Sequence, residues 1–84
     1  MTKYNSKDLD TIYHALANSA RRKMLTRLAA EGPLSVLQLA EPFEMSLAAV
    51  SKHIKVLEKS GLLRKEKKST THLCHFNPGV IEIA

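Results

Sequence analysis

Two closely spaced helix start signals constrain this chain more than any other feature. Ser35–Gln38 has the pattern of a capping box, in which the serine hydroxyl accepts from the glutamine amide while the glutamine side chain reaches back. Pro42 then ends that helix, because the residue before a proline is pushed away from helical angles. Ser46 is a second N-cap. The sequence therefore predicts a short helix, a tight turn at 43–45, and a longer helix from Leu47 to about Ser60 with Gly61 after it.

The longer helix is strongly two-sided. At 100° per residue its apolar residues fall within a sector of about 80° and its basic residues lie opposite. The apolar set, expected in the core, is Leu47, Val50, Ile54 and Leu57, and the opposite set is Ala48, Lys52, Lys55 and Lys59. Ser51 and His53 flank the boundary. One face should be buried and the other basic and exposed to solvent.

The rest of the chain predicts two helices before this pair and a hairpin after it. Apolar residues at helical spacing predict a helix over residues 8–17, and a second helix over 20–31 is ended by Gly32-Pro33. Beyond Gly61 two short runs, 62–65 and 71–76, have strand character and enclose a basic tip. The expected order is four helices and a β-hairpin, mainly α, with residues 80–84 starting a further helix or trailing as a strand.

The size of the chain limits what it can do. Its 84 residues allow one domain, and its single cysteine cannot form an internal disulfide. The sequence shows no signal peptide and no run near the roughly 18 apolar residues of a bilayer span, which indicates the cytoplasm. A core this small rarely supplies more than about 3–5 kcal/mol, so an oligomer is expected. We find no nucleophile beside a base, no paired carboxylates and no phosphate-binding loop, which argues against an enzyme.

The positive charge is concentrated in one segment. The formal net charge is +5, and residues 46–72 alone hold seven basic and two acidic residues. A solvated lysine face would explain scattered lysines, but concentration in one segment creates a local positive potential that attracts polyanions.

Together these features predict a winged helix-turn-helix, with the helix pair at about 35–60 and the wing at about 62–76. A helix fits the major groove of DNA if the side chains near its start are short. The basic residues of the longer helix and of the wing tip would then contact bases and phosphates. The expected DNA-contacting residues are Ser46, Ala48, Ala49, Ser51, Lys52, His53, Lys55, Lys67, Lys68, Ser69 and Thr70.

The same segment resembles a known family. Residues 39–58, with Val50-Ser51-Lys52-His53-Ile54-Lys55-Val56-Leu57 at their centre, are similar to the DNA-reading segment of the ArsR/SmtB family of bacterial winged-helix repressors. Residues 15–25 and Ser60-Gly61-Leu62-Leu63 extend the match, which covers about residues 9–76. The resemblance implies a cytoplasmic homodimer that binds an inverted-repeat operator and blocks transcription. It also implies that Ser51, Lys52 and His53 belong to the helix placed in the groove.

Two departures from the family pattern affect the expectations. Metal-sensing members carry a Cys-x-Cys type motif on the helix that corresponds to residues 35–40, and this chain has no sulfur there. Members usually continue into a fifth helix that pairs across the dimer, whereas only eight residues follow Phe76, so that helix is expected to be truncated or absent. The dimer interface is therefore expected to rely on the first helix. Its candidate residues are Leu9, Ile12, Tyr13 and Leu16.

Other readings of single residues are weaker. Three potential metal ligands lie close together in the sequence: His72, Cys74 and His75. On a strand only His72 and Cys74 share a face, whereas a tetrahedral metal site requires three or four ligands. We therefore expect no metal site at this cluster, and no cofactor, metal or small-molecule ligand can be inferred from the sequence. Arg21 opposes the dipole of the second helix, which suggests an outside carboxylate or phosphate, but an internal salt bridge is expected. For His53, packing support and DNA contact are weighed equally.

Two alternative functions remain open at this stage. The helix pair can also dock into a protein groove, with its lysines meeting an acidic partner. A regulator tuned by a ligand or by oxidation of Cys74 is a third, weaker possibility.

Overall fold

The computed structural model describes residues 6–80, and it confirms the mainly helical fold with a β-hairpin. The elements are α1 (Ser6–Leu16), α2 (Ser19–Glu31), β1 (Leu34–Ser35), α3 (Val36–Ala40), α4 (Leu47–Ser60), β2 (Leu63–Lys68) and β3 (Thr71–Phe76). α1 begins two residues earlier than the sequence predicts. The expectation for residues 81–84 lies outside the described residues.

The predicted caps fix the ends of α3 and α4. The Ser35 hydroxyl accepts from the Gln38 amide at 3.1 Å, and the Gln38 side chain accepts from the Ser35 amide at 2.9 Å. The Ser46 hydroxyl accepts from the Ala49 amide at 3.1 Å. Gly61 ends α4 at φ 84°, a left-handed angle that favours glycine. These contacts satisfy helix-terminal groups that would otherwise lack partners, and so fix where α3 begins and where α4 begins and ends.

The sheet has one strand more than the sequence predicts. β1 pairs antiparallel with β3, so the strand order is β1-β3-β2. A two-residue strand is too short to show an alternating pattern, and Ser35 already serves as a helix cap. β2 also runs three residues further than predicted, to Lys68, which shortens the hairpin loop to Ser69 and Thr70. Ser69 adopts the left-handed φ of 61° that this tight turn needs.

The core lies between the helices and the inner face of the sheet. α4 packs on α1 and β2, and α2 packs on β3. The fully buried large side chains are Ile12, Met24, Leu39, Val50, Ile54, Leu57, Leu62 and Cys74. Leu47 was expected among them, but its side chain is 49% exposed, so the apolar stripe of α4 is buried from Val50 onward. Leu47 stands in the first turn of α4, where the core has ended.

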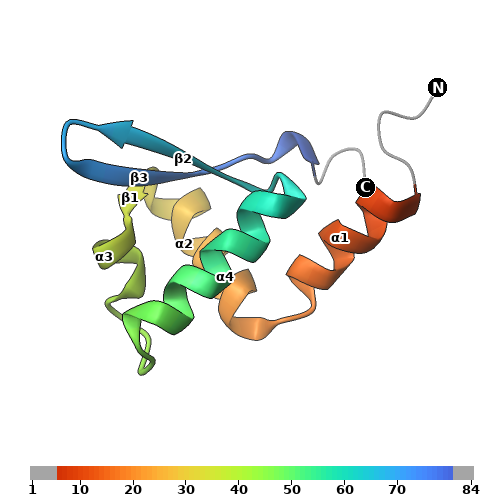
Figure 1. Ribbon diagram of the computed structural model, residues 1–84, viewed down its shortest axis with the longest axis horizontal. Helices are drawn as coiled ribbons and strands as arrows, with labels where there is room; N and C mark the ends of the chain where they lie inside the picture. The colour runs from red at the N-terminus through yellow and green to blue at the C-terminus, as the bar shows by residue number, and fades with distance from the viewer. Residues whose placement is uncertain (1–5, 81–84) are drawn as a thin grey trace.

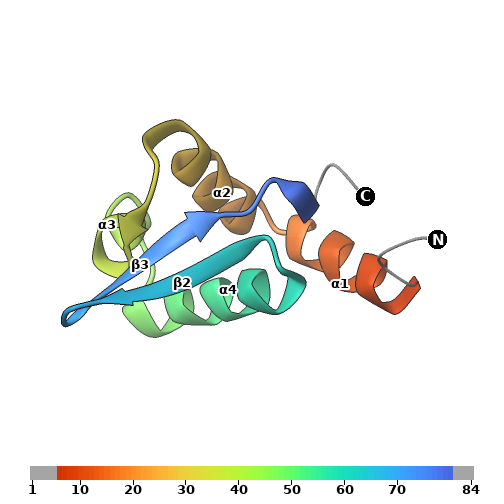
Figure 2. The same ribbon diagram turned by 90° about the horizontal axis from the view of Figure 1, so that it is seen from above.

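The arrangement brings two distant segments to one end of the molecule. Figure 1 shows the start of α4 and the β2–β3 turn on the same side, with α1 at the opposite end. In Figure 2, seen from above, the hairpin crosses the helices and extends past α4 at that same end. A surface formed by the first turns of α4 and the hairpin tip is therefore available to one partner.

Candidate nucleic-acid interface

The outer side of α4 is exposed and basic, as its spacing predicts. We call Ala48, Lys52, Lys55 and Lys59 the basic face of α4, and all four are exposed. Ala49, Ser51 and His53 border it and are partly buried. Ser46 is exposed, but its hydroxyl is already engaged with the Ala49 amide at 3.1 Å. Short side chains thus occupy the first turn, and longer cations follow them.

A buried arginine ties α4 to the neighbouring helices. Arg21 on α2 donates from Nε to the Ala15 carbonyl at 2.7 Å and from Nη2 to the His14 carbonyl at 2.8 Å. Its Nη1 lies 3.3 Å from Nδ1 of His53 on α4. No carboxylate within residues 6–80 pairs with Arg21, so the expected internal salt bridge is not found there. Arg21 instead satisfies carbonyls at the C-terminal end of α1, where a cation also complements the helix dipole.

His53 is a support for α4 in this structure. The arginine can only donate, so Nδ1 of His53 accepts and the ring proton of the neutral form resides on Nε2. Burial, and next the charge of Arg21, lower the pKa of His53 from its ordinary value of 6.5. Two roles were considered for His53, packing support and DNA contact. The structure provides a partner for the first, namely Arg21.

α3 is attached to α2 by a second arginine. Arg27 donates from Nη1 to the Gln38 carbonyl at 2.7 Å and pairs with Glu31 at 2.8 Å. The hydrogen bond from Arg27 lowers the pKa of the Glu31 carboxyl. The contact fixes the end of α3, and with it the turn that leads into α4.

The hairpin forms an exposed basic wing. Lys67, Lys68, Ser69 and Thr70 are all exposed, but both lysines belong to β2 and only Ser69 and Thr70 form the loop. Closer to the core, Lys65 lies 3.6 Å from Glu58 of α4. Two exposed residues near this surface were not among the DNA-contacting residues predicted from the sequence. Arg64 adds charge to β2, and Leu47 places an apolar side chain beside the basic face; the alternation of the longer β2 strand would have exposed Arg64.

Cys74 and its histidine neighbours are not arranged as a site. Cys74 is fully buried, and burial raises the pKa of its thiol, which disfavours the reactive thiolate. His72 is exposed on the same face, and His75 faces away and lies 3.1 Å from Glu66. Among residues 6–80, no group of three potential metal ligands comes together.

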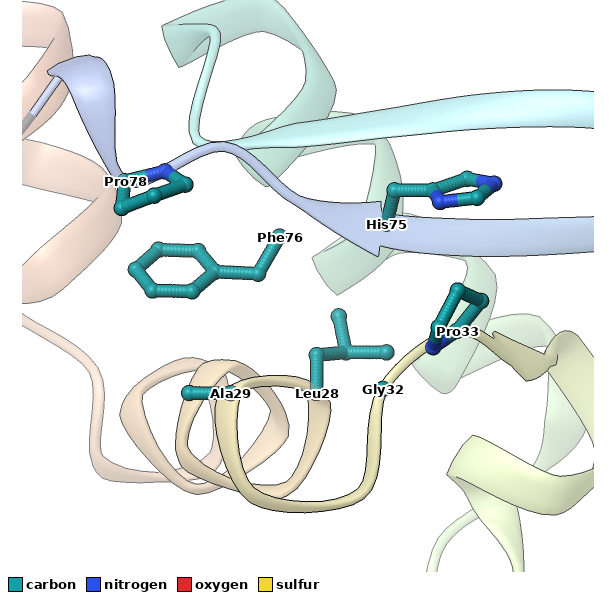
Figure 3. Close-up of a pocket in the computed structure, with 7 residues that line it drawn as sticks. All are labelled: Leu28, Ala29, Gly32, Pro33, His75, Phe76 and Pro78. Carbon is teal, nitrogen blue, oxygen red and sulfur yellow. The ribbon is translucent and has the colours of Figure 1, made fainter.

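The surface also has a shallow hollow of about 360 Å³ between α2 and β3. Figure 3 shows Leu28 and Phe76 across its middle, with Pro33 and Pro78 near its ends. Among the described residues that line it, His75 is the only one with an ionisable side chain, and its ring lies 3.1 Å from Glu66. Ligand sites usually aim several polar groups at the bound molecule, so this lining provides apolar surface without a recognisable ligand chemistry.

The candidate dimer residues on α1 divide between core and surface. Ile12 is 1% exposed and packs within the core of the protomer. Tyr13 is 56% exposed, and Leu9 and Leu16 are partly buried against the core.

None of the helices in residues 6–80 has the length and apolar character needed to cross a membrane.

A capped short–long helix pair with a basic outer face, followed by an exposed basic hairpin, defines a winged helix-turn-helix DNA-binding domain. A family model described as a helix-turn-helix domain matches residues 16–66. The chain belongs to the ArsR family of winged helix-turn-helix transcriptional regulators.

Relatives of known sequence support this assignment. The HTH-type transcriptional regulator Rv2034 of Mycobacterium tuberculosis is 37% identical over 78 residues, which make up 93% of this chain and 70% of the relative. The arsenical resistance operon repressor of Bacillus subtilis is 33% identical over 70 residues, or 83% of this chain and 62% of the relative. These proteins are transcriptional regulators and not enzymes.

Solved structures share the fold. The crystal structure of the ArsR family transcriptional regulator RHA00566 is 37% identical, with a TM-score of 0.88, and the match covers 99% of this chain and 84% of that one. The homodimeric winged helix-turn-helix DNA-binding domain of Mb0332 from Mycobacterium bovis has a TM-score of 0.81 at 22% identity, covering 98% of this chain and 82% of that one.

Proposed function

We propose that this chain is a sequence-specific repressor that binds double-stranded DNA in the cytoplasm, as a homodimer on an inverted-repeat operator. One observation supports the proposal above all others. The first turns of α4, which carry Ala48 and Lys52, lie at the same end of the molecule as the turn between β2 and β3, and the basic face continues from there along α4 to Lys59. A polyanion with a groove beside its charged backbone is the partner that suits this surface.

The dimensions of α4 suit the major groove. A helix about 10–12 Å wide enters a groove about 12 Å wide if its leading side chains are short. Ala48 and Ala49 would allow close approach, and their methyl groups would contact thymine methyls. Ser51 would bond to a phosphate or a base edge, and Lys52 would reach a guanine or the backbone.

The remaining cations would position the protein on the duplex. Lys55, one turn beyond Lys52, would contact phosphates. The wing residues Lys67, Lys68, Ser69 and Thr70 would contact the flanking backbone or the minor groove. Such contacts fix the register of the protein without reading sequence.

We further propose that two copies associate through α1. The helix exposes Tyr13 at its surface with Leu9 and Leu16 partly accessible, and the Mycobacterium bovis domain of the same fold is homodimeric. A two-fold dimer would read half-sites about one helical turn apart, roughly 34–36 Å. The Bacillus subtilis relative is a repressor, and a dimer bound at an operator would block transcription in the same way.

Fluorescence anisotropy tests DNA binding directly. A labelled duplex of about 30 base pairs spans two half-sites. Binding should be strong at low salt, and the logarithm of the affinity should fall linearly with the logarithm of salt concentration through counterion release. Selection of bound sequences from a random duplex pool should then yield an inverted repeat. Absence of binding at every salt concentration would contradict the proposal and favour an acidic protein partner.

Sedimentation tests the dimer separately. Tyr13→Asp should raise the dissociation constant of the dimer, because it places a charge within the proposed contact. Leu37→Asp is the matched control, since Leu37 is an exposed apolar residue on α3. If both variants associate like the unaltered chain, α1 does not form the interface.

A further inference from the structure

Leu47 is an exposed large apolar residue on α4, the helix of the proposed DNA contact. It is the first residue of α4, directly after the Ser46 cap, and its side chain is 49% exposed. Within residues 6–80 the other large apolar side chains with such exposure are Tyr13 on α1 and Leu37 on α3. Leu47 therefore needs an explanation that neither the core nor the α1 surface supplies.

Leu47 lies at the edge of the apolar stripe of α4 that is nearer to the basic face. At 100° per residue Leu47 lies about 40° from Ser51, which follows one turn later and borders that face. Side chains on a helix also tilt toward its N-terminus. Leu47 thus projects ahead of Ser51 at the start of α4, and recognition helices contact base edges with their N-terminal residues.

The surroundings of Leu47 indicate what it contacts. One half-exposed leucine offers far less area than the roughly 800 Å² that each partner buries in a stable protein interface. The exposed residue next to it on α4 is the small Ala48, and the cationic Lys52 follows in the second turn. A single methyl group set in a polyanionic groove matches both features, and in the major groove only thymine presents one, at C5.

We propose that Leu47 is a specificity-determining residue that packs against the C5 methyl group of one thymine in each half-site. This inference rests on the proposed DNA-binding function and assigns a base preference to one residue within it. The side chain buries apolar surface against the methyl group, while Lys52 and Lys55 engage polar groups nearby. Sequences with another base at that position lose this contact.

Replacement of thymine by deoxyuridine removes only the methyl group and so isolates this contact. In a duplex selected by the unaltered protein from a random pool, each thymine is replaced in turn and the affinity is measured by anisotropy. One position per half-site, in addition to any thymine that Ala48 or Ala49 contacts, should weaken binding about four-fold, the effect of losing one buried methyl group. The quantity compared is the affinity for the thymine duplex divided by the affinity for the deoxyuridine duplex. With Leu47→Ala this ratio should fall to about one at that position, and with Leu37→Ala it should stay at about four.

The outcomes separate this inference from the function on which it rests. If no duplex binds, both fail. If duplexes bind but no thymine is sensitive to loss of its methyl group, the inference alone fails, and that measurement needs no variant. Retention of the full ratio by a folded Leu47→Ala, checked by circular dichroism, would assign the methyl contact to Ala48 or Ala49. Loss of the ratio in Leu37→Ala would also overturn it.

Discussion

α4 and the wing both carry exposed basic side chains, but they differ in how far each is packed against the core. Behind the basic face of α4, the side chains of Val50, Ile54 and Leu57 are completely or almost completely buried. The outer half of the wing, residues 67–72, has no buried residue and consists of a two-stranded ribbon with a two-residue loop. The helix is thus fixed by the core along most of its length, and the wing only at its base.

This difference separates the tasks that the two regions can perform. Reading a base edge requires a side chain held to within a fraction of an ångström, which a helix fixed by the core can provide. Long lysines on a projecting ribbon supply charge without such precision and suit phosphate contacts. We therefore expect substitutions on α4 to change sequence preference and substitutions on the wing to change affinity for every duplex.

The largest expected effect comes from removing the support of α4. Arg21→Ala deletes a buried donor and leaves the His14 and Ala15 carbonyls without that partner. The free energy of unfolding should fall by about 2–4 kcal/mol, as measured by urea denaturation. Arg22→Ala is the control, because Arg22 is exposed and donates to one carbonyl, that of Leu16. Equal losses in the two variants would refute the special role of Arg21.

Lys52→Ala tests base reading by α4. The selected duplex should bind about 5- to 150-fold more weakly, the range of a lost base contact, while a random duplex should change little. Competition anisotropy at fixed salt measures both affinities. If the two duplexes lose the same factor, Lys52 contacts only phosphate and the contrast with the wing disappears.

Lys67→Ala is the matching substitution on the wing. Selected and random duplexes should weaken by a similar factor, and the slope of log affinity against log salt should decrease by about one unit for each protomer bound. A salt series with both duplexes supplies the measurement. Weakening confined to the selected duplex would mean that the wing reads sequence.

The smallest expected effect concerns pH. The pKa of folded His53 lies below 6.5, so as the pH falls below that value the unfolded chain takes up a proton before the folded chain does. The stability contributed by neutral His53 is present above pH 6.5 and is lost as the pH falls through the lower pKa of the folded state. His53→Gln should therefore reduce the decline in unfolding free energy on acidification, as measured by urea denaturation. An unchanged decline would show that His53 is not responsible.

Local signals predicted the elements that position the site. The Ser35 capping box, the Ser46 cap and the Gly61 terminus depend on neighbouring residues alone, and the structure confirms all three. The exposure of Lys52 and Lys55 follows from helical spacing, because that spacing fixes which face turns away from the apolar stripe.

Features that depend on distant contacts were missed. β1 exists only because β3 pairs with it from some forty residues away (Leu34 with Cys74). The partners of Arg21 come from α1 and α4, and no local pattern identifies backbone carbonyls as the partners of an arginine. Leu47 fits the apolar stripe by angle, but the periodicity does not reveal that the core ends before the first turn of α4.

Mapping of amide chemical shifts during a titration with the selected duplex tests the interface most directly. The largest changes should occur at residues 46–55 and 67–70, with small changes on the outer face of α1 away from the DNA. Large changes confined to α1 and the hollow beside Phe76, with residues 46–55 unaffected, would contradict the assignment of α4 as the helix that reads DNA.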